Sequence, residues 1–256
     1  VQDGTNTMKH DGYDIEFSNV GFSYETGDVV LKDVSFVAKQ GEVTALIGPS
    51  GGGKTTVSRL ASRFWDVNRG SITVGGMDIS KVDPETLMSL YSIVFQDVTL
   101  FNNTILENIR IGKMDATDEE VIAAAKAAHA DHFIKTLPGG YQMELNEDAS
   151  NVSQGQKQLL TIARAILADN KILILDEATS SVDTRTEVTI QKAMDNLMRG
   201  RTSFVIAHRL STIRNADLIL VMKDGDIVEQ GNHEELLEKN GFYANLYNSQ
   251  FEDVVA

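Results

Sequence analysis

The segment that most constrains the fold is residues 48–56, Gly-Pro-Ser-Gly-Gly-Gly-Lys-Thr-Thr, which fits the pattern G-x-x-x-x-G-K-[ST]. An apolar run at 43–47 predicts a strand before it, and residues 56–61 predict a helix after it. Glycines without a Cβ let backbone N–H groups converge on phosphate oxygens, and a helix N-terminus favours negative charge. The segment therefore predicts a phosphate-binding loop between a strand and a helix.

Two side chains of this loop suit nucleotide chemistry. Lys54 is placed to reach the β- and γ-phosphates as a point charge, and the hydroxyl of Thr55 is placed to bind Mg²⁺. A glycine-rich turn without function is the alternative, and the lysine, the hydroxyl and the flanking elements together argue against it.

A second motif lies at 171–177, Lys-Ile-Leu-Ile-Leu-Asp-Glu. Four consecutive apolar residues indicate a strand that is buried on both faces, as in parallel sheets. Asp176 at its end is suited to hold Mg²⁺, directly or through water. Glu177 is suited to orient and deprotonate a water that attacks the γ-phosphate. The alternative is a pair of solvated acids at a strand end.

Three further residues lie where α/β sheets place ligands or next to the phosphate loop. Gln96 follows an apolar strand candidate at 93–95, and His208 follows another at 203–207. His208 is a candidate for contacting the γ-phosphate, although a strand-end histidine is often structural. Tyr24 lies upstream of the loop, where its ring could stack on adenine or simply pack in a sheet.

Composition narrows the function classes. The 256 residues include 23 Lys and Arg against 37 Asp and Glu, for a net charge of −14, which argues against binding to nucleic acid. The absence of cysteine excludes disulfides, thiolate metal sites and a cysteine nucleophile. No apolar run approaches the ~20 residues that a membrane-spanning helix needs.

The order of the patterns predicts an α/β fold with a helical insertion. Residues 1–12 are polar and resemble a linker. Residues 13–96 alternate short strands and turns around the phosphate loop, and residues 97–170 are mainly helical, with helices expected at 118–130 and 153–167. Residues 171–256 return to buried strands, followed by an expected amphipathic helix at 234–246.

Together these motifs resemble the nucleotide-binding domain of an ATP-binding-cassette (ABC) transporter, over nearly the whole chain from Tyr13 onward. Residues 48–56 match the Walker A loop and 172–176 the Walker B strand. Val-Ser-Gln-Gly-Gln at 152–156 is similar to the signature motif, usually Leu-Ser-Gly-Gly-Gln, and Ser-Ser-Val-Asp at 180–183 matches the D-loop. Tyr24, Gln96 and His208 match the A-loop aromatic, the Q-loop glutamine and the switch histidine.

The resemblance implies a fold and a set of site residues. The fold is a P-loop NTPase core with a mixed, mainly parallel sheet, an N-terminal antiparallel β subdomain and an inserted helical subdomain. Glu177, His208, Gln96 and Lys54 would be catalytic, and Thr55, Gln96 and Asp176 would bind Mg²⁺. The implied nucleotide contacts are Tyr24, Gly48, Ser50, Gly51, Gly52, Gly53, Lys54, Thr55 and Thr56, with Ser153, Gly155, Gln156 and Asp183 from the signature and D-loop.

The resemblance also implies partners. Two such domains, as a homodimer or a heterodimer, would enclose two ATP molecules, each Walker A loop facing the other chain's signature motif. Residues 99–109 resemble the exporter branch, in which a membrane domain is fused upstream. Residues 1–12 would then be the linker from that domain, and residues 13–256 the ATPase domain at the cytoplasmic face of the membrane. Closure on ATP and opening after hydrolysis would drive export.

Departures from the family pattern leave alternatives open. Gln154 replaces the first glycine of the signature, which puts in doubt the site that this chain's signature would complete. Residues 145–149, Leu-Asn-Glu-Asp-Ala, depart from the exporter segment Val-Gly-Glu-Arg-Gly but retain Glu147. A soluble cassette ATPase not coupled to transport is the main alternative, and a nucleotide-responsive module with little turnover is a third. The intact Glu177 argues against the last.

Overall fold

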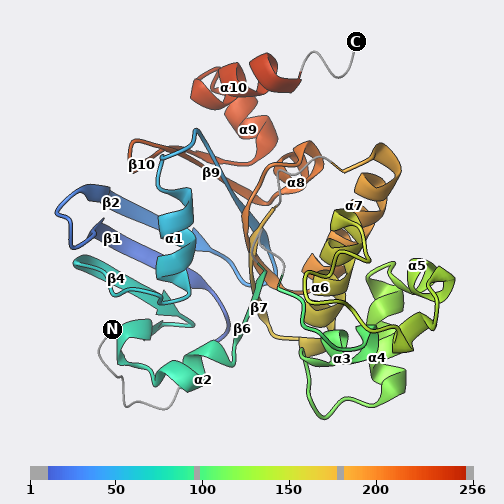
Figure 1. Cartoon of the computed structure of the whole chain (residues 1–256). Helices are drawn as coiled ribbons and strands as arrows, with labels where there is room; N and C mark the ends of the chain where they lie inside the picture. The colour runs from blue at the N-terminus through green and yellow to red at the C-terminus, as the bar shows by residue number, and fades with distance from the viewer. Residues whose placement is uncertain (1–10, 95–98, 178–181, 252–256) are drawn as a thin grey trace. The chain divides into compact units, whose positions relative to one another are not determined.

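The structure of the chain is a computed structural model that describes residues 11–94, 99–177 and 182–251. The described residues form two compact units (Figure 1). The first unit takes its residues from 1–91, 171–177 and 200–256, and the second from 92–170 and 178–199. The second unit includes α7, at residues 184–198.

An antiparallel sheet with the strand order β2-β1-β4-β5 forms one part of the first unit. β1 lies centrally, so that Ile15 pairs with Ala38 on one side and with Val74 on the other. The rings of Phe17 and Phe36 stack on its buried face with centroids 4.5 Å apart. The strands of this sheet are β1 (Ile15–Ser23), β2 (Val29–Ala38), β4 (Arg69–Val74) and β5 (Met77–Asp78).

A mainly parallel sheet forms the other part of the first unit, with β10-β9-β3-β8-β7 as neighbours in that order. β3 pairs in parallel with β8 and β9, β7 pairs in parallel with β8, and β10 pairs antiparallel with β9. Every residue of β8 is buried, as expected for a strand covered on both faces. The strands are β3 (Val43–Ile47), β7 (Ile172–Asp176), β8 (Thr202–Ile206), β9 (Leu218–Lys223) and β10 (Asp226–Gly231).

Short helices connect the strands, and β6 is the last strand in the order of the six-stranded sheet. Tyr91, which opens β6, is buried and its hydroxyl donates to the carbonyl of Ala61 at 2.9 Å. The connecting elements are α1 (Lys54–Ala61), η1 (Ile79–Lys81), α2 (Pro84–Met88), β6 (Tyr91–Val94) and α8 (Leu210–Asn215).

The C-terminal region differs from the single helix expected at 234–246. It contains two helices, α9 (His233–Glu238) and α10 (Phe242–Phe251). Asn240 adopts a left-handed backbone conformation with a φ of 49°, which an α-helix cannot contain, and Gly241 follows it. The expectation of one continuous helix is therefore wrong.

The second unit is helical. Its central helix α6 packs against α3, α4 and α7, and α6 and α7 lie side by side (Figure 1). The buried face of α6 includes Leu159, Leu160, Ile162 and Ala163, in agreement with the predicted apolar stripe. The elements of this unit are α3 (Ile105–Arg110), α4 (Asp118–Ala127), α5 (Asp131–Thr136), η2 (Gly140–Gln142), α6 (Gln154–Ala168) and α7 (Thr184–Met198).

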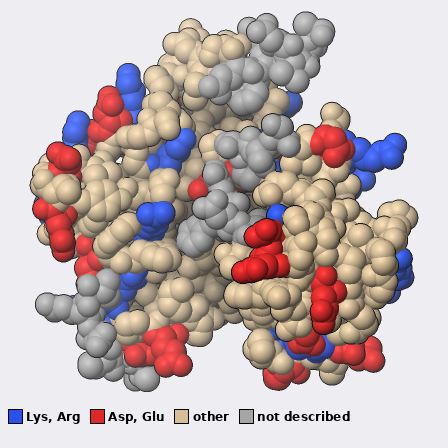
Figure 2. Space-filling model, in the orientation of Figure 1, with Lys and Arg blue, Asp and Glu red and all other residues tan. Residues whose placement is uncertain are grey.

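These elements confirm the predicted fold class, a mixed and mainly parallel sheet with an antiparallel sheet and an inserted helical region. On the face shown in Figure 2, the basic side chains of the described residues are scattered among acidic ones and form no continuous basic stripe. Within the described part of the chain, no helix has both the length and the apolar character required to cross a bilayer.

Candidate nucleotide-binding site

The phosphate loop is shaped by glycines that no other residue could replace without strain. Gly48 has a φ of 140° and Gly53 a φ of 103°, in the region that favours glycine. A Cβ on Gly48 would lie 2.0 Å from the carbonyl oxygen of Met222, so the loop rests directly on the backbone of β9. The fold thus requires glycine at position 48 before any ligand is considered.

The helix that follows the loop begins without a capping side chain. Gly53 is the N-cap residue of α1 and provides no side-chain cap hydrogen bond, whereas α6 is capped by Ser153 and α7 by Asp183. The first backbone N–H groups of a helix have no partner within it and carry partial positive charge. An anion such as phosphate is the complementary ligand for this helix start.

Lys54 lies at the same place, with its Nζ donating to the carbonyl oxygen of Gly48. Burial lowers the pKa of Lys54, and the nearby carboxylate of Asp176 opposes that shift. A cavity of about 350 Å³ borders this lysine. Its lining comprises Ile47, Gly48, Pro49, Ser50, Lys54, Ala207, His208, Ile213, Phe242, Tyr243, Leu246 and Tyr247.

The carboxylate of Glu177 is buried and accepts several hydrogen bonds within the first unit. It accepts hydrogen bonds from the backbone N–H groups of His208 at 2.9 Å and Arg209 at 3.2 Å. The Thr212 hydroxyl donates to it at 2.9 Å, and the Arg209 guanidinium forms an ion pair with it at 3.2 Å. Glu177 is only 1% exposed, so this neutralisation is what makes its burial tolerable.

The pKa of His208 is shifted by burial and by nearby charged groups of the site. Partial desolvation lowers the pKa of its ring, the Lys54 ammonium lowers it further, and the Asp176 carboxylate acts in the opposite direction. A neutral imidazole can accept a hydrogen bond at one nitrogen and donate one at the other. The lowered pKa favours this neutral form of the ring.

Tyr24 lies against the helix that follows the phosphate loop. Its hydroxyl and that of Thr56 are 3.0 Å apart, and its ring packs edge-to-face on Phe22 and Trp65 with centroid distances of 4.9 and 5.2 Å. Tyr24 is only half-buried. Both alternatives raised by the sequence, sheet packing and a ring available for stacking, are compatible with this placement.

In the second unit, two helices begin next to each other. Ser153 and Gln156 form a reciprocal capping box at the start of α6, and Asp183 caps α7 through the backbone N–H of Thr186. A Cβ on Gly155 would lie 2.4 Å from Cγ2 of Thr186, so the two helix starts are in close contact. The unit thereby brings the signature residues and Asp183 together.

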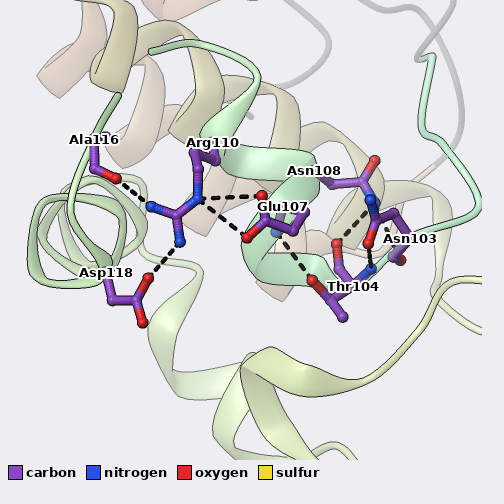
Figure 3. Close-up of polar contacts among 7 residues, drawn as sticks. All are labelled: Asn103, Thr104, Glu107, Asn108, Arg110, Ala116 and Asp118. Carbon is purple, nitrogen blue, oxygen red and sulfur yellow. Dashed lines mark hydrogen bonds and ion pairs between the residues drawn. The ribbon is translucent and has the colours of Figure 1, made fainter. Parts of the chain in front are cut away.

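The exporter-like segment 99–109 is organised by one buried side chain. Asn108 accepts from the backbone N–H of Phe101 at 2.8 Å and donates to the carbonyls of Phe101 and Thr104 at 3.0 and 2.9 Å. Figure 3 shows it next to Asn103 and Thr104, with Arg110 bonded to Glu107, Asp118 and the Ala116 carbonyl on the other side of the helix. Asn108 therefore fixes the turn that precedes α3.

The first unit thus brings together the phosphate loop, Asp176, Glu177, His208 and Tyr24. Gln96 lies outside the described residues. The second unit holds Ser153, Gly155, Gln156 and Asp183. Sequence reasoning missed Arg209, Thr212 and the aromatic residues of α10 that line the cavity. The Arg-Leu-Ser-Thr sequence directly after His208 was the available signal for the first two.

Comparison with known proteins identifies the family. Residues 31–180 match the family described as ABC transporter, which is more than half of the chain. The chain belongs to the ABC transporter family. The predicted family is therefore confirmed, and membership implies a nucleotide-binding domain.

Several relatives and one solved structure are similar over most of the chain. The chain is 52% identical to an uncharacterized ABC transporter ATP-binding protein, YfiC, of Bacillus subtilis. The match covers 93% of this chain and 39% of YfiC. The chain is 53% identical over 90% of its length to a fatty acid ABC transporter ATP-binding/permease protein of Mycobacterium bovis, covering 36%. It is 52% identical to an ATP-dependent lipid A-core flippase of Desulfotalea psychrophila, in a match that covers 92% of this chain and 41% of the flippase.

A bacterial Atm1-family ABC exporter with ATP bound matches the fold with a TM-score of 0.90 and 42% identity, covering 98% of this chain and 44% of that one. The chain thus spans about two fifths of the length of the relatives it matches. The Mycobacterium relative is described by its name as both an ATP-binding and a permease protein.

Proposed function

We propose that the chain binds and hydrolyses Mg-ATP as the ATPase domain of an exporter at the cytoplasmic face of a membrane. One observation carries this proposal. Lys54, Asp176 and His208 follow or end β3, β7 and β8, which are adjacent parallel strands whose last paired residues, Leu46, Ile206 and Asp176, are in register. Groups at the carboxyl ends of parallel strands meet at one edge of the sheet, where α/β proteins bind ligands.

The residues of this edge fit ATP. The uncapped start of α1 and the glycine conformations at 48 and 53 suit a phosphate chain, with Ser50, Gly51, Gly52, Thr55 and Thr56 completing the loop. Thr55, Gln96 and Asp176 would hold Mg²⁺, whose charge would offset that of the phosphates. Lys54 would contact the terminal phosphates, and Tyr24 would stack on the adenine.

Hydrolysis would rest on Glu177 and His208. Glu177 would accept a proton from the attacking water, and His208 would contact the terminal phosphate and keep that water aligned. Arg209 and Thr212 hold the Glu177 carboxylate in its present position. These contacts would have to loosen or reorient for Glu177 to reach a water.

A second copy or a homologous half would complete the site. Ser153, Gly155, Gln156 and Asp183 would then face the nucleotide of the partner domain, and closure of the pair would be passed to a transmembrane domain. Such closure is a two-state change biased by contacts to the terminal phosphate.

The decisive experiment uses Glu177→Gln, which keeps the shape of the side chain but removes the proton acceptor. Size-exclusion chromatography with light scattering, with and without Mg-ATP, is combined with an ATPase assay. We expect ATP binding without turnover and an ATP-dependent dimer, whereas Glu85→Gln, an exposed control on α2, turns over ATP normally. Full turnover by Glu177→Gln would overturn the assignment of the base.

The oligomeric state of Glu177→Gln indicates which partner the chain needs for closure. A dimer of Glu177→Gln means that the signature with Gln154 can close on an identical chain, which supports a homodimer. A monomer that binds ATP indicates that a different half or the membrane domain is needed for closure.

A further inference from the structure

Two 15-residue helices of the second unit, α6 and α7, touch at their N-terminal ends through a glycine and a threonine. Gly155 is buried at the second position of α6. A Cβ built on it would lie 2.4 Å from Cγ2 of Thr186 and 3.1 Å from Cγ1 of Val182. The approach is therefore so close that only a residue without a side chain fits beside Thr186.

The side chain of Thr186 is also held by hydrogen bonds to Asp183. Its hydroxyl donates to Oδ2 of Asp183 at 2.6 Å, and its backbone N–H donates to Oδ1 of Asp183 at 3.0 Å. With the hydroxyl fixed on the carboxylate, the methyl group is directed at Gly155. Thr186 is half-buried between the two motifs, so it has little freedom to move aside.

Gly155 is in turn tied to the signature serine. The Ser153 backbone N–H donates to Oε1 of Gln156 at 2.9 Å, and the Gln156 backbone N–H donates to the Ser153 hydroxyl at 3.2 Å. A displacement of Gly155 would therefore displace Ser153 with it. The contacts form a continuous path from Ser153 through Gly155 and Thr186 to Asp183.

We propose that Thr186 is a positioning residue, which fixes the signature segment against the Asp183 turn so that the two move as one rigid body. This inference rests on the proposed function in one respect, namely that Ser153 and Asp183 serve a nucleotide site. α7 groups with the helical unit and not with β7, which precedes it in sequence, as expected for a helix connected to α6.

The test is a rescue experiment on the purified chain. Gly155→Ala introduces the Cβ that meets the Thr186 methyl. Thr186→Ser removes that methyl and retains the hydroxyl that bonds to Asp183. The double variant should then accommodate the alanine, because the remaining 3.1 Å contact with Val182 needs a shift of only a few tenths of an ångström.

Two readouts are measured for each variant. The first is the midpoint of urea unfolding, which does not depend on ATP. The second is the ATPase rate at saturating ATP together with the ATP affinity. We expect Gly155→Ala to lower the midpoint and to reduce the maximal rate at least tenfold with an ATP affinity within twofold of the wild type. The double variant should recover at least half of both losses.

Thr189→Ser is the matched control. It removes the same methyl group one turn further along α7, where the Thr189 hydroxyl donates to the Arg185 carbonyl at 3.2 Å. It should not rescue Gly155→Ala. Equal recovery with Thr189→Ser, no recovery with Thr186→Ser, or an unaffected Gly155→Ala would each overturn the proposal.

A further variant covers the case in which Gly155→Ala does not fold. Thr186→Val retains the shape against Gly155 but cannot donate to Asp183. We expect it to fold and bind ATP as the wild type does, with a maximal rate at least fivefold lower; a wild-type rate would contradict the proposal. A wild-type chain without any ATPase activity would overturn the proposed function, while the urea midpoints would still decide whether Thr186 and Gly155 are coupled.

Discussion

Thr212 and Glu177 are joined by a hydrogen bond of 2.9 Å between two buried side chains, the hydroxyl of one and the carboxylate of the other. The bond links the start of α8 to the end of β7. It means that the residue proposed to act on water is held by a helix that carries no other recognised motif residue. The bond therefore has consequences for both stability and turnover.

Replacing Thr212 by valine should destabilise the chain. The variant keeps the shape but removes a donor to a buried charge, at a cost of ~1.5–3 kcal/mol in the free energy of unfolding. Thr212→Ser keeps the hydroxyl and should lose no more than about 1 kcal/mol, the order expected for one buried methyl group. Urea unfolding of the two variants measures the difference, and equal losses would show that the hydrogen bond contributes nothing.

Replacing Lys54 by alanine should abolish or greatly weaken ATP binding. The ammonium group lies at the phosphate loop, where no other lysine or arginine lines the cavity among the described residues. Isothermal titration with ATP measures the loss, with the exposed Lys81→Ala as the control for a change of net charge. Unchanged affinity in Lys54→Ala would contradict the assignment of the loop.

The pKa of His208 should respond to the charge of Lys54. Desolvation and the Lys54 ammonium hold this pKa below its ordinary value of 6.5. The native state therefore binds fewer protons than the unfolded state just below that pH, so the contribution of His208 to stability is present above pH 6.5 and is lost as the pH falls through its folded pKa.

An NMR titration of the histidine rings tests this directly. Wild-type His208 should titrate below 6.5, and Lys54→Met should raise its pKa because one of its three lowering causes, which are desolvation and the charges of Lys54 and Arg209, is removed. Asp176→Asn should lower it further, because the opposing carboxylate is lost. A His208 pKa that is the same in all three proteins would show that these charges do not act on the ring.

Replacing Asn108 by leucine should loosen the turn before α3. The side chain is 1% exposed and bonds to backbone groups of Phe101 and Thr104. Leaving such groups without partners costs ~1–3 kcal/mol. Hydrogen exchange of residues 99–109 and urea unfolding report the effect. Asn102→Ala, an exposed change in the same turn, should leave both measurements near the wild-type values.

The sequence predicted the fold and the family because its strongest signals are local. The phosphate loop requires glycines at 48 and 53, and the structure gives both a positive φ. The apolar run at 172–175 is buried throughout, as a central parallel strand requires. Such features depend on a few adjacent residues and on a strand–loop–helix order, so they can be recognised without knowledge of the tertiary structure.

The remaining features depend on contacts between distant segments. The end of α9 before Asn240 was missed because the apolar pattern of 234–246 continues across a left-handed residue. The roles of Thr212 and Thr186 follow from what they touch, and neither contact has a sequence period that would reveal it. The assignment of the individual site residues stays a prediction until the variants are measured.

Gly48 and Gly155 should differ in their evolutionary freedom. A side chain at position 48 would collide with the main-chain oxygen of residue 222, which every amino acid carries, so no compensating substitution can arise there. A side chain at position 155 would collide with a methyl group at 186, which a serine lacks. Homologues should therefore be invariant at the first glycine, whereas the second can drift together with its neighbour on α7.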